Sequence, residues 1–378
     1  MEKAENNIAF IRSAKNSYSV RLSVIIPVYN EEKNIKKCVE SIIAQIQADD
    51  EILIINNNST DRTLEICKNL QILNTNIYVY SEKKRGVSAA RNRGLELARG
   101  SFVMFVDGDD YLPYGILSLL MKNAKNFPGK IVQGNILLEK EYLENVYSGE
   151  INQEAILESK YMQEIALYPI KYRKREKEWV LNSVYGVCGK IFPKAIISDM
   201  RFYEDTALGE DMLFYLETLH KTDVIIVLSN CVYVVNDHNS ESSTRRINPM
   251  LAESVTVTVD RLIELCGKDE KMQENLNYQI FRHIEVGVLE QAEKVCMQKT
   301  VAEMTSYIKL HLEPRKEIYK KAYKVVLGRR FKEGIKRYIL YYLAISFLKN
   351  EKYRSYCQFI CTKEKIKRYK NGSAKKVN

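Results

Sequence analysis

The sequence predicts an α/β fold, a mostly parallel sheet with helices on both faces, followed by a helical C-terminal region. Over roughly the first 140 residues, short apolar runs alternate with segments whose apolar side chains recur at helical spacing. Polar clusters come directly after the apolar runs, and from about Asn248 onward the pattern is helical. Because parallel strands need crossover connections that are usually helices, the alternation predicts a parallel sheet.

The strands are expected in four apolar segments, residues 22–29, 51–56, 76–81 and 101–106. Their nearly continuous apolar character is what burial on two faces requires. Helices are expected between them: one begins near Ile35, a second follows a cap at Ser59 or Thr60, and a third runs from Val87 to Leu97.

The remainder is expected to be mixed and then helical. Residues 141–200 are less regular, 204–220 predict a loop and an amphipathic helix, and 223–235 supply further strands. We therefore expect three parts: an N-terminal extension (1–20), an α/β domain (21–246) and a basic helical C-terminal domain (247–378).

Composition and charge indicate which class of protein the chain belongs to. With 46% hydrophobic and 28% charged residues, the 378-residue chain has the composition of a globular protein. The net charge of +10 comes from residues 313–378, which hold 20 Lys or Arg and 5 Asp or Glu. Eight cysteines without a C-x-x-C pair predict reduced thiols. Reduced thiols indicate a cytoplasmic protein. Neither a signal peptide nor an apolar run of the ~20 residues needed to cross a membrane is found.

The polar clusters are expected to line one cleft, because ligands of parallel sheets bind beyond the carboxyl ends of the strands. Three carboxylates, Asp107, Asp109 and Asp110, follow the fourth strand around Gly108. A D-x-D cluster of this kind favours a divalent cation, Mg²⁺ or Mn²⁺, that also binds substrate phosphates. The alternative is a turn in which Asp109 caps the next helix and the other carboxylates face solvent.

Four spaced blocks carry a family pattern: "SVIIPVYNEEKNIKKCVESI", "EILIINNNSTDRT", "RGVSAARNRGLELARGSFVMFVDGDDYL" and "FYEDTALGEDMLF". In this order and spacing they resemble glycosyltransferase family 2, inverting enzymes of GT-A fold, from about Leu22 to Asn239. The resemblance implies metal-dependent transfer from a nucleotide-sugar to a glycan, lipid-linked or polymer acceptor in bacterial glycan biosynthesis.

The resemblance places Pro27, Val28, Tyr29 and Glu31 beside the nucleobase and ribose. The Tyr29 ring offers a stacking face and Glu31 can accept from ribose hydroxyls, although Tyr29 also suits a half-buried strand end. Asn57 stands where the family usually has an Asp that accepts from the uracil imino N–H. UDP is expected, with another base as the alternative, since an amide adds a donor and lacks the charge.

The same resemblance assigns roles around the carboxylates. Arg91 matches the family's Ala-Arg-Asn position, and Arg91 and Arg85 are expected near the nucleotide-sugar, while Arg93, and alternatively Arg85, suit a solvated helix face. Asp107 is implied near ribose and metal, with Gly108 beside the nucleotide-sugar. Asp109 is implied as a direct metal ligand, and Asp110 as its support.

In this family the general base is the Asp of a late Glu-Asp pair, which makes Asp211, after Glu210, the expected base. The pair precedes a helix, whose N-terminus favours an ionised carboxylate. Glu204-Asp205 is a competing pair, and Asp211 also suits a helix cap.

Other candidates lie further along the chain. His238 is a candidate third metal ligand, with Arg245 or Arg246 on phosphate, although a His in a polar loop is often solvated. Trp179 and Tyr185 are candidates for stacking on acceptor sugars, or for core packing.

Residues 313–378, here called the basic tail, have the pattern of basic amphipathic helices that contact an anionic membrane. The alternative is a helical bundle whose basic side chains face solvent. Nucleic acid is not an expected partner. A dehydrogenase or related nucleotide enzyme would need a glycine-rich loop after the first strand, where this chain has "PVYNEEKN". A catalytically weak or inactive domain that acts as a membrane-binding or partner-binding scaffold is the remaining alternative.

Overall fold

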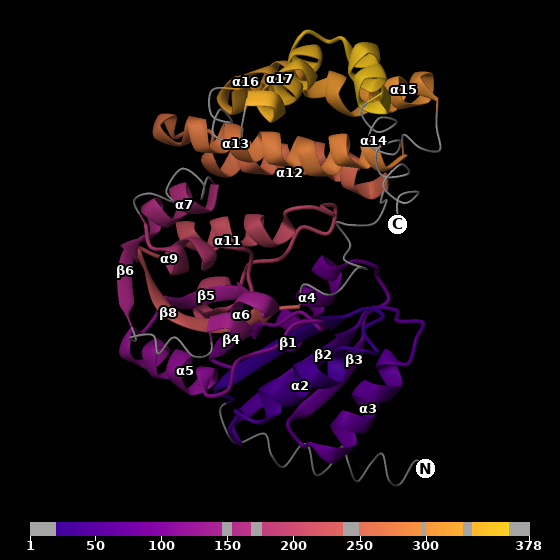
Figure 1. Ribbon diagram of the computed structural model, residues 1–378. Helices are drawn as coiled ribbons and strands as arrows, with labels where there is room; N and C mark the ends of the chain where they lie inside the picture. Colours follow the sequence, from indigo (N-terminus) through magenta and orange to yellow (C-terminus); the bar gives the residue numbers. More distant parts are fainter. Residues whose placement is uncertain are drawn as a thin grey trace. The chain divides into compact units, whose positions relative to one another are not determined.

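The computed structural model describes residues 20–145, 153–167, 176–236, 249–295, 300–327 and 335–362 (Figure 1). The chain divides into two compact units, which are residues 1–204 with 214–239, and residues 205–213 with 240–378. The predicted boundary after residue 246 and nearly all of the predicted N-terminal extension lie outside the described residues. Among the helices that are described, none is both long enough and apolar enough to cross a membrane.

The predicted parallel sheet is confirmed in the first unit (Figure 1). Its strands are β1 (Leu22–Val28), β2 (Asp50–Asn56), β3 (Ile77–Ser81) and β4 (Phe102–Phe105). They lie in the order β3-β2-β1-β4, and each neighbouring pair is parallel. Every residue of β1 and β2 is buried, as strands covered on both faces require.

Helices cover both faces of this half of the sheet. They are α2 (Ile35–Ile43), α3 (Thr63–Leu73), α4 (Val87–Leu97) and α5 (Ile116–Asn126). α2, α3 and α5 share one core with Val24 and Ile26 of β1. Ile25 points to the other face, since strand side chains alternate, and there it meets α4. A Cβ on Gly94 of α4 would lie 2.3 Å from Ile25 Cγ2, so α4 packs with its backbone close to the sheet.

The other strands continue the sheet with mixed directions. They are β5 (Ile131–Leu138), β6 (Glu154–Glu158), β7 (Lys190–Pro193) and β8 (Val224–Val235), in the order β4-β7-β5-β8-β6. β7 is antiparallel to β4 and β5, whereas β5 and β8 are parallel. Further strands are expected in residues 223–235, and the structure has a single long strand there, β8. β5 pairs with one side of β8 and β6 with the other.

Short helices connect these strands: α6 (Glu139–Asn145), α7 (Ser159–Leu167), α9 (Glu178–Asn182) and α10 (Lys194–Ile197). An aromatic cluster joins β4 and β7 to the segments that follow them. The Phe105 ring contacts those of Phe192, Phe202 and Phe214 edge-on, and Phe202 and Phe214 stack with centroids 4.1 Å apart. Arg91 of α4 lies over the Phe202 ring, which ties the cluster to that helix.

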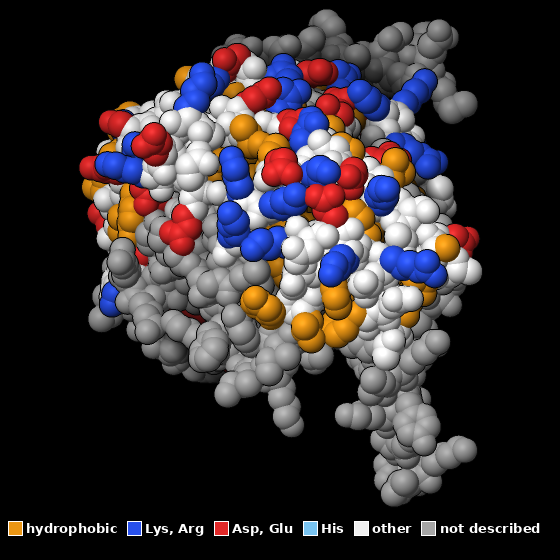
Figure 2. Space-filling view, turned by 90° about the horizontal axis from the view of Figure 1, so that it is seen from above, with side chains coloured by type: hydrophobic (Ala, Val, Ile, Leu, Met, Phe, Trp, Pro, Cys, Tyr) orange, Lys and Arg blue, Asp and Glu red, His pale blue; other side chains and the backbone are white. Residues whose placement is uncertain are grey.

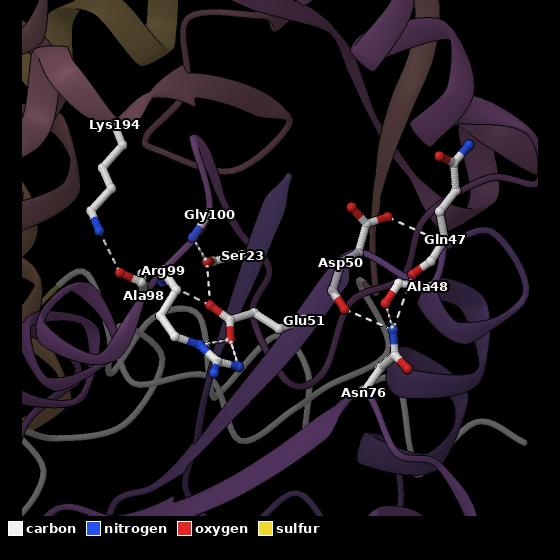
Figure 3. A network of polar contacts seen from close by, with 10 residues as sticks. All are labelled: Ser23, Gln47, Ala48, Asp50, Glu51, Asn76, Ala98, Arg99, Gly100 and Lys194. Atoms are coloured by element: carbon white, nitrogen blue, oxygen red, sulfur yellow. Dashed lines mark hydrogen bonds and ion pairs between the residues drawn. The ribbon is translucent and has the colours of Figure 1, made fainter. Parts of the chain in front are cut away.

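A polar network closes the amino end of the parallel sheet (Figure 3). Glu51 is buried, and it accepts hydrogen bonds from Ser23 Oγ at 2.6 Å, Arg99 N at 2.8 Å and Arg99 Nη2 at 2.6 Å. Ser23 Oγ in turn accepts from Gly100 N at 2.8 Å. The network joins the starts of β1 and β2 to the turn that leads into β4.

From residue 249 onward the described residues of the second unit form helices joined by short turns, which confirms the predicted helical C-terminal region. Its principal helices are α12 (Pro249–Cys266), α13 (Gln273–Ile284), α14 (Glu290–Val295), α15 (Val301–Leu312), α16 (Lys316–Leu327) and α17 (Ile335–Lys349). Shorter turns are η1 (Glu270–Met272), η2 (Glu285–Leu289, a π-helix) and η3 (Glu313–Arg315). The helix predicted after the loop from residue 204 is α11 (Glu210–His220), whose first turn belongs to this unit.

Candidate active site

The turn after β4 packs directly against the loop after β1. A Cβ on Gly108 would lie 2.8 Å from Val28 Cγ1, 3.4 Å from Pro27 O and 3.6 Å from Glu31 Cγ. This close approach leaves no room for a side chain, which accounts for a glycine between the two aspartates. The turn thereby places three residues predicted for nucleotide binding beside the carboxylates.

Asp107 is held by three groups from separate parts of the first unit. Arg91 Nη2 donates to its Oδ1 at 2.9 Å, and Cys188 Sγ lies 3.6 Å from its Oδ2. Tyr233 OH accepts from its backbone N–H at 3.0 Å. Burial, reinforced by the charge of Asp107, raises the pKa of the Cys188 thiol, which therefore stays protonated as a donor.

Asp110 stabilises the turn through hydrogen bonds to β8 and to the residue that follows it. It is buried, its Oδ2 accepts from Tyr233 OH at 2.7 Å, and its Oδ1 accepts from Asn236 N at 2.9 Å. Burial, followed by the charges of Asp109 and Asp107, raises the pKa of Asp110 to about 8. A cation bound at this turn would relieve the repulsion among these carboxylates.

Tyr233, Cys188 and Asn236 were missed in the sequence. Tyr233 lies within an apolar strand segment, and Cys188 was interpreted simply as a reduced thiol. Their contacts with the turn span sequence separations of 81 to 126 residues. The pairing order of β4, β7, β5 and β8 creates these contacts, and a single sequence does not reveal that order.

The donor set suits a cation that is shared with a substrate. Among the described residues, no group of three or more His, Cys, Asp or Glu side chains is arranged to hold a metal ion. Mg²⁺ in nucleotide-dependent enzymes is commonly held by one or two carboxylates together with substrate phosphates, so a three-ligand protein site is not required. The Asp107 side chain is 35% exposed and Asp109 is half-buried, which leaves both accessible at the turn.

The backbone and side-chain amide of Asn57 are hydrogen-bonded to neighbouring segments of the protein. Its backbone N–H donates to Val28 O at 2.8 Å, which joins the ends of β1 and β2. Its Nδ2 donates to Glu82 O at 3.2 Å and to Lys84 O at 2.6 Å, and its Oδ1 accepts from Gly86 N at 2.8 Å. The amide therefore clamps the segment that leads into α4, and an aspartate could not donate to those two carbonyls.

The remaining predicted nucleotide residues differ in exposure. The Tyr29 side chain is 52% exposed, which makes a ring face available at the end of β1. Arg91 is buried and paired with Asp107, whereas Arg85 is exposed in the segment before α4. Arg93 pairs with Glu96 one turn further along α4, as a helix-surface pair does.

The two candidate acidic pairs lie in different surroundings. Glu204 pairs with Lys84 and accepts from Asn92 Nδ2 at 2.9 Å, and these two groups lower its pKa. Glu210 and Asp211 begin α11 and belong to the second unit, in residues 205–213. Asp211 Oδ1 accepts from Met212 N at 2.7 Å. Glu204 is thus engaged in holding its segment to α4, while Asp211 begins a helix.

The candidate acceptor residues lie in α9 and in the loop between α9 and β7. Trp179 is half-buried in α9, and the Tyr185 side chain is 53% exposed. Lys190 is fully buried, and its Nζ donates to the carbonyls of Ser183 at 2.7 Å and of Tyr185 and Cys188 at 3.3 Å. The ammonium group fixes the loop that presents Tyr185. His238, Arg245 and Arg246 lie outside the described residues.

Comparisons with known proteins find glycosyltransferases. Residues 23–193 match the family model described as "Glycosyl transferase family 2". The chain is 27% identical to glycosyltransferase GlyA of Streptococcus pneumoniae serotype 4 over 267 residues, which are 70% of this chain and 36% of that protein. It is 31% identical over 188 residues to the GalNAc(5)-diNAcBac-PP-undecaprenol beta-1,3-glucosyltransferase of Campylobacter jejuni, covering 49% of this chain and 55% of that enzyme.

A solved structure shares the fold. S. aureus TarS 1–349, solved in complex with UDP-GlcNAc, superposes with a TM-score of 0.63 over 91% of this chain and 92% of that chain. The two sequences are 18% identical across that superposition, so the likeness concerns the fold.

Proposed function

Residues 23–193 form a family 2 glycosyltransferase domain of GT-A fold, and on this premise we propose that the enzyme is an inverting, metal-dependent transferase that uses a UDP-sugar. The acceptor would be a hydroxyl of a glycan, a polymer or a lipid-linked glycan. The Campylobacter relative, whose name contains a PP-undecaprenol-linked glycan, supports the lipid-linked class.

The observation that carries the proposal is the contact between the carboxylate turn and the β1 loop. Gly108 sets the turn against Pro27, Val28 and Glu31, so groups suited to a nucleoside and groups suited to a cation share one edge of the sheet. Asp109 and Asp107 would hold Mg²⁺ or Mn²⁺, with His238 as a further candidate ligand. When bound, the ion neutralises charge on the departing diphosphate.

The protein's own groups prepare this chemistry. Arg91 orients Asp107, and the Tyr233 hydroxyl fixes the turn, since it accepts from Asp107 N and donates to Asp110 Oδ2. Asp211 accepts the proton of the acceptor hydroxyl as the hydroxyl oxygen attacks the anomeric carbon. Attack opposite the leaving group inverts the anomeric centre, so an α-linked donor gives a β-linked product.

UDP remains the proposed nucleotide, although the Asn57 side chain is hydrogen-bonded to Glu82, Lys84 and Gly86. An amide oxygen has two lone pairs, so Oδ1 can accept from Gly86 N and from a uracil imino N–H together. TarS, which shares the fold, was solved with UDP-GlcNAc. Arg85 would then contribute to the nucleotide-sugar only if its exposed side chain moves onto the ligand.

A donor panel tests the function. The full chain is incubated with UDP-, GDP- and dTDP-sugars and Mn²⁺, and release of free nucleotide is measured. We expect turnover with a UDP-sugar. Asp211→Asn should lower transfer by about a thousandfold while UDP affinity changes less than twofold, because a general base acts on the acceptor. Equal loss of both would remove Asp211 from the base role.

The alternative function, a weak or inactive domain that acts as a scaffold, draws on the Asn57 clamp, which gives the amide oxygen a partner within the protein. No turnover and no thermal shift with any nucleotide-sugar would favour the scaffold. Release of UDP at rates that depend on Mn²⁺ would rule it out.

Contact of the basic tail with an anionic membrane at the inner face of the cytoplasmic membrane is a further proposal. Part of the charge is already paired within the chain: Lys320 contacts Glu317 and Glu351, and Lys316 contacts Glu313 and Glu351. Figure 2 shows basic and acidic side chains interspersed on the face in view. Flotation with phosphatidylserine vesicles against neutral ones tests the contact, and equal binding to both would refute it.

A further inference from the structure

The loop that carries Asp211 belongs with the helices of the second unit. Residues 205–213, here called the base loop, group with residues 240–378, although the chain on both sides of the loop belongs to the sheet unit. Thr258 of α12 is fully buried, and its Oγ1 donates to Leu208 O in the base loop at 2.9 Å. The backbone of the loop is therefore held by a side chain from α12.

Gly209 fits the base loop closely against α13. Its φ is +86°, a backbone conformation that favours glycine. A Cβ at this position would lie 2.4 Å from His283 Nε2 and 3.3 Å from Thr258 Cγ2. The turn directly before Glu210 and Asp211 therefore has no space between it and the two helices.

The His283 ring is fixed on the side away from the loop. It is buried, and its Nδ1 lies 2.9 Å from Gln279 O, one turn earlier in α13. A carbonyl only accepts, so the proton is assigned to Nδ1, and Nε2 faces the Gly209 turn. Burial lowers the pKa of His283 below its usual range, against the hydrogen bond to Gln279 and the charge of Asp211, which raise it.

Two more contacts join the base loop to the helices of the second unit. Gln279 Nε2 lies 3.1 Å from Met212 Sδ, directly after Asp211. On the other side, a Cβ on Gly287 would lie 3.3 Å from Leu208 Cδ2. Gly287 belongs to η2, a π-helical turn that follows α13, and π-turns inside helices are frequent at functional sites.

We propose that α12 and α13 form a seat for the base loop, in which His283 and Thr258 are positioning residues for Asp211. The inference rests on the proposed role of Asp211 and extends it. The helical C-terminal region then has a part in catalysis itself, because it fixes the backbone from which the base projects. His283 acts through the Gly209 turn and takes no proton from the acceptor.

The test compares four single variants of the full chain and one double variant. His283→Ala, Thr258→Val and Gly209→Ala disturb the seat, and His311→Ala is the matched control. His311 is a partly buried histidine elsewhere in the second unit, and its ring packs on Tyr307 in α15. Each variant is measured for kcat, for donor KM, and for hydrogen exchange of the amides in residues 205–213.

We expect kcat to fall about 10- to 100-fold in His283→Ala and Gly209→Ala, because a base displaced by about 1 Å loses that much rate. Donor KM should stay within about twofold, since the nucleotide binds elsewhere. Exchange in the base loop should rise about tenfold in His283→Ala and Thr258→Val. The Gly209→Ala/His283→Ala double variant should lose less than the product of the single losses, because removing the ring relieves the clash. His311→Ala should match the wild type.

Unchanged kcat and unchanged loop exchange in both His283→Ala and Thr258→Val would overturn the inference, even if Gly209→Ala fails to fold. Equal loss in His311→Ala would overturn it as well, since the effect would then be general to the helical unit. A wild type that transfers no sugar from any donor would refute the proposed function. Wild-type turnover with unaffected variants would refute only the seat.

Discussion

At the amino end of the parallel sheet, carboxylates are surrounded by donors from the protein itself. Glu51 is 1% exposed and binds Ser23 and three nitrogens of Arg99 (Figure 3). Asp50 beside it pairs with Arg21 and accepts from Gln47 N. Burial raises the pKa of Asp50, while the backbone of Gln47 and the guanidinium of Arg21 lower it.

The carboxyl end has the opposite arrangement. Asp107, Asp109 and Asp110 lie within one turn, and Arg91 pairs with Asp107. After burial, the largest effects on the pKa of Asp110 are the charges of its two acidic neighbours, which raise it further. At one end the neighbours of a buried carboxylate stabilise its charge, and at the other they repel it.

The comparison separates a structural role from a functional one. A buried carboxylate that is paired with donors of the protein holds segments of the folded chain together, and removing one partner is costly. Carboxylates that repel one another at a ligand-binding edge are arranged for a charge that comes from outside. The predictions below test this distinction, from the largest expected effect to the smallest.

Asp109→Asn should have the largest effect and should act on activity alone. We expect transfer to fall by about a thousandfold, because the variant loses a charged cation ligand. The free energy of unfolding in EDTA should change by less than about 0.5 kcal/mol. Steady-state transfer and urea denaturation measure the two. A large loss of stability would mean that this carboxylate is structural, like Glu51.

Glu51→Gln should show the reverse pattern. Glu51 is buried but Arg99 is 46% exposed, so losing these charged hydrogen bonds should cost about 2 kcal/mol. The urea midpoint should therefore fall while kcat of the folded enzyme stays near the wild-type value. Glu96→Gln is the control, since its pair with Arg93 is exposed and contributes about 0.3 kcal/mol. Loss of kcat at unchanged stability in Glu51→Gln would contradict the comparison.

Stability in EDTA should depend on pH through Asp110. Its pKa is raised to about 8 from 3.8, so between these values the folded state binds more protons than the unfolded state. The contribution of this group to stability is therefore greatest at low pH and falls as pH rises toward 8, on the order of 3 to 4 kcal/mol between pH 5 and pH 8. Denaturation at pH 5 and pH 8 measures the slope, and Asp110→Asn should flatten it. An equal slope in both proteins would show that Asp110 is not the responsible group.

Asn57→Asp should have a smaller effect, on the donor. A carboxylate cannot donate to Glu82 O and Lys84 O, so the segment before α4 should loosen and donor KM should rise about tenfold. Asn74→Asp is the matched control, since this half-buried amide at the end of α3 donates to Leu70 O within its own helix, away from the segment before α4. A lower KM for UDP-sugars would mean that the charge aids the base more than the clamp does.

Much of the first unit could be predicted from the sequence because its signals are local. The four parallel strands and their helices follow from apolar periodicity, and the carboxylates fall at the strand ends where ligands bind. Gly108 was placed with the nucleotide-sugar, but the sequence did not show that the residue lets the turn meet Val28. The contact depends on the distance between two strands.

The rest depends on pairings that are distant in sequence. Tyr233 reaches the turn because β8 lies beyond β7 and β5 in the sheet, and nothing in the strand's own residues reveals that order. The base loop was predicted as part of the α/β domain, whereas it groups with helices that begin after residue 240. His283 looks like an ordinary core residue until Gly209 is seen against its ring.

The central claim is that the carboxylates after β4 capture a cation together with a nucleoside diphosphate. The most direct test is isothermal titration of the full chain with UDP, in Mn²⁺ and in EDTA. We predict at least about tenfold tighter binding with Mn²⁺, or about 1.4 kcal/mol, and loss of that difference in Asp109→Asn. Equal affinity for UDP in Mn²⁺ and in EDTA would contradict the account.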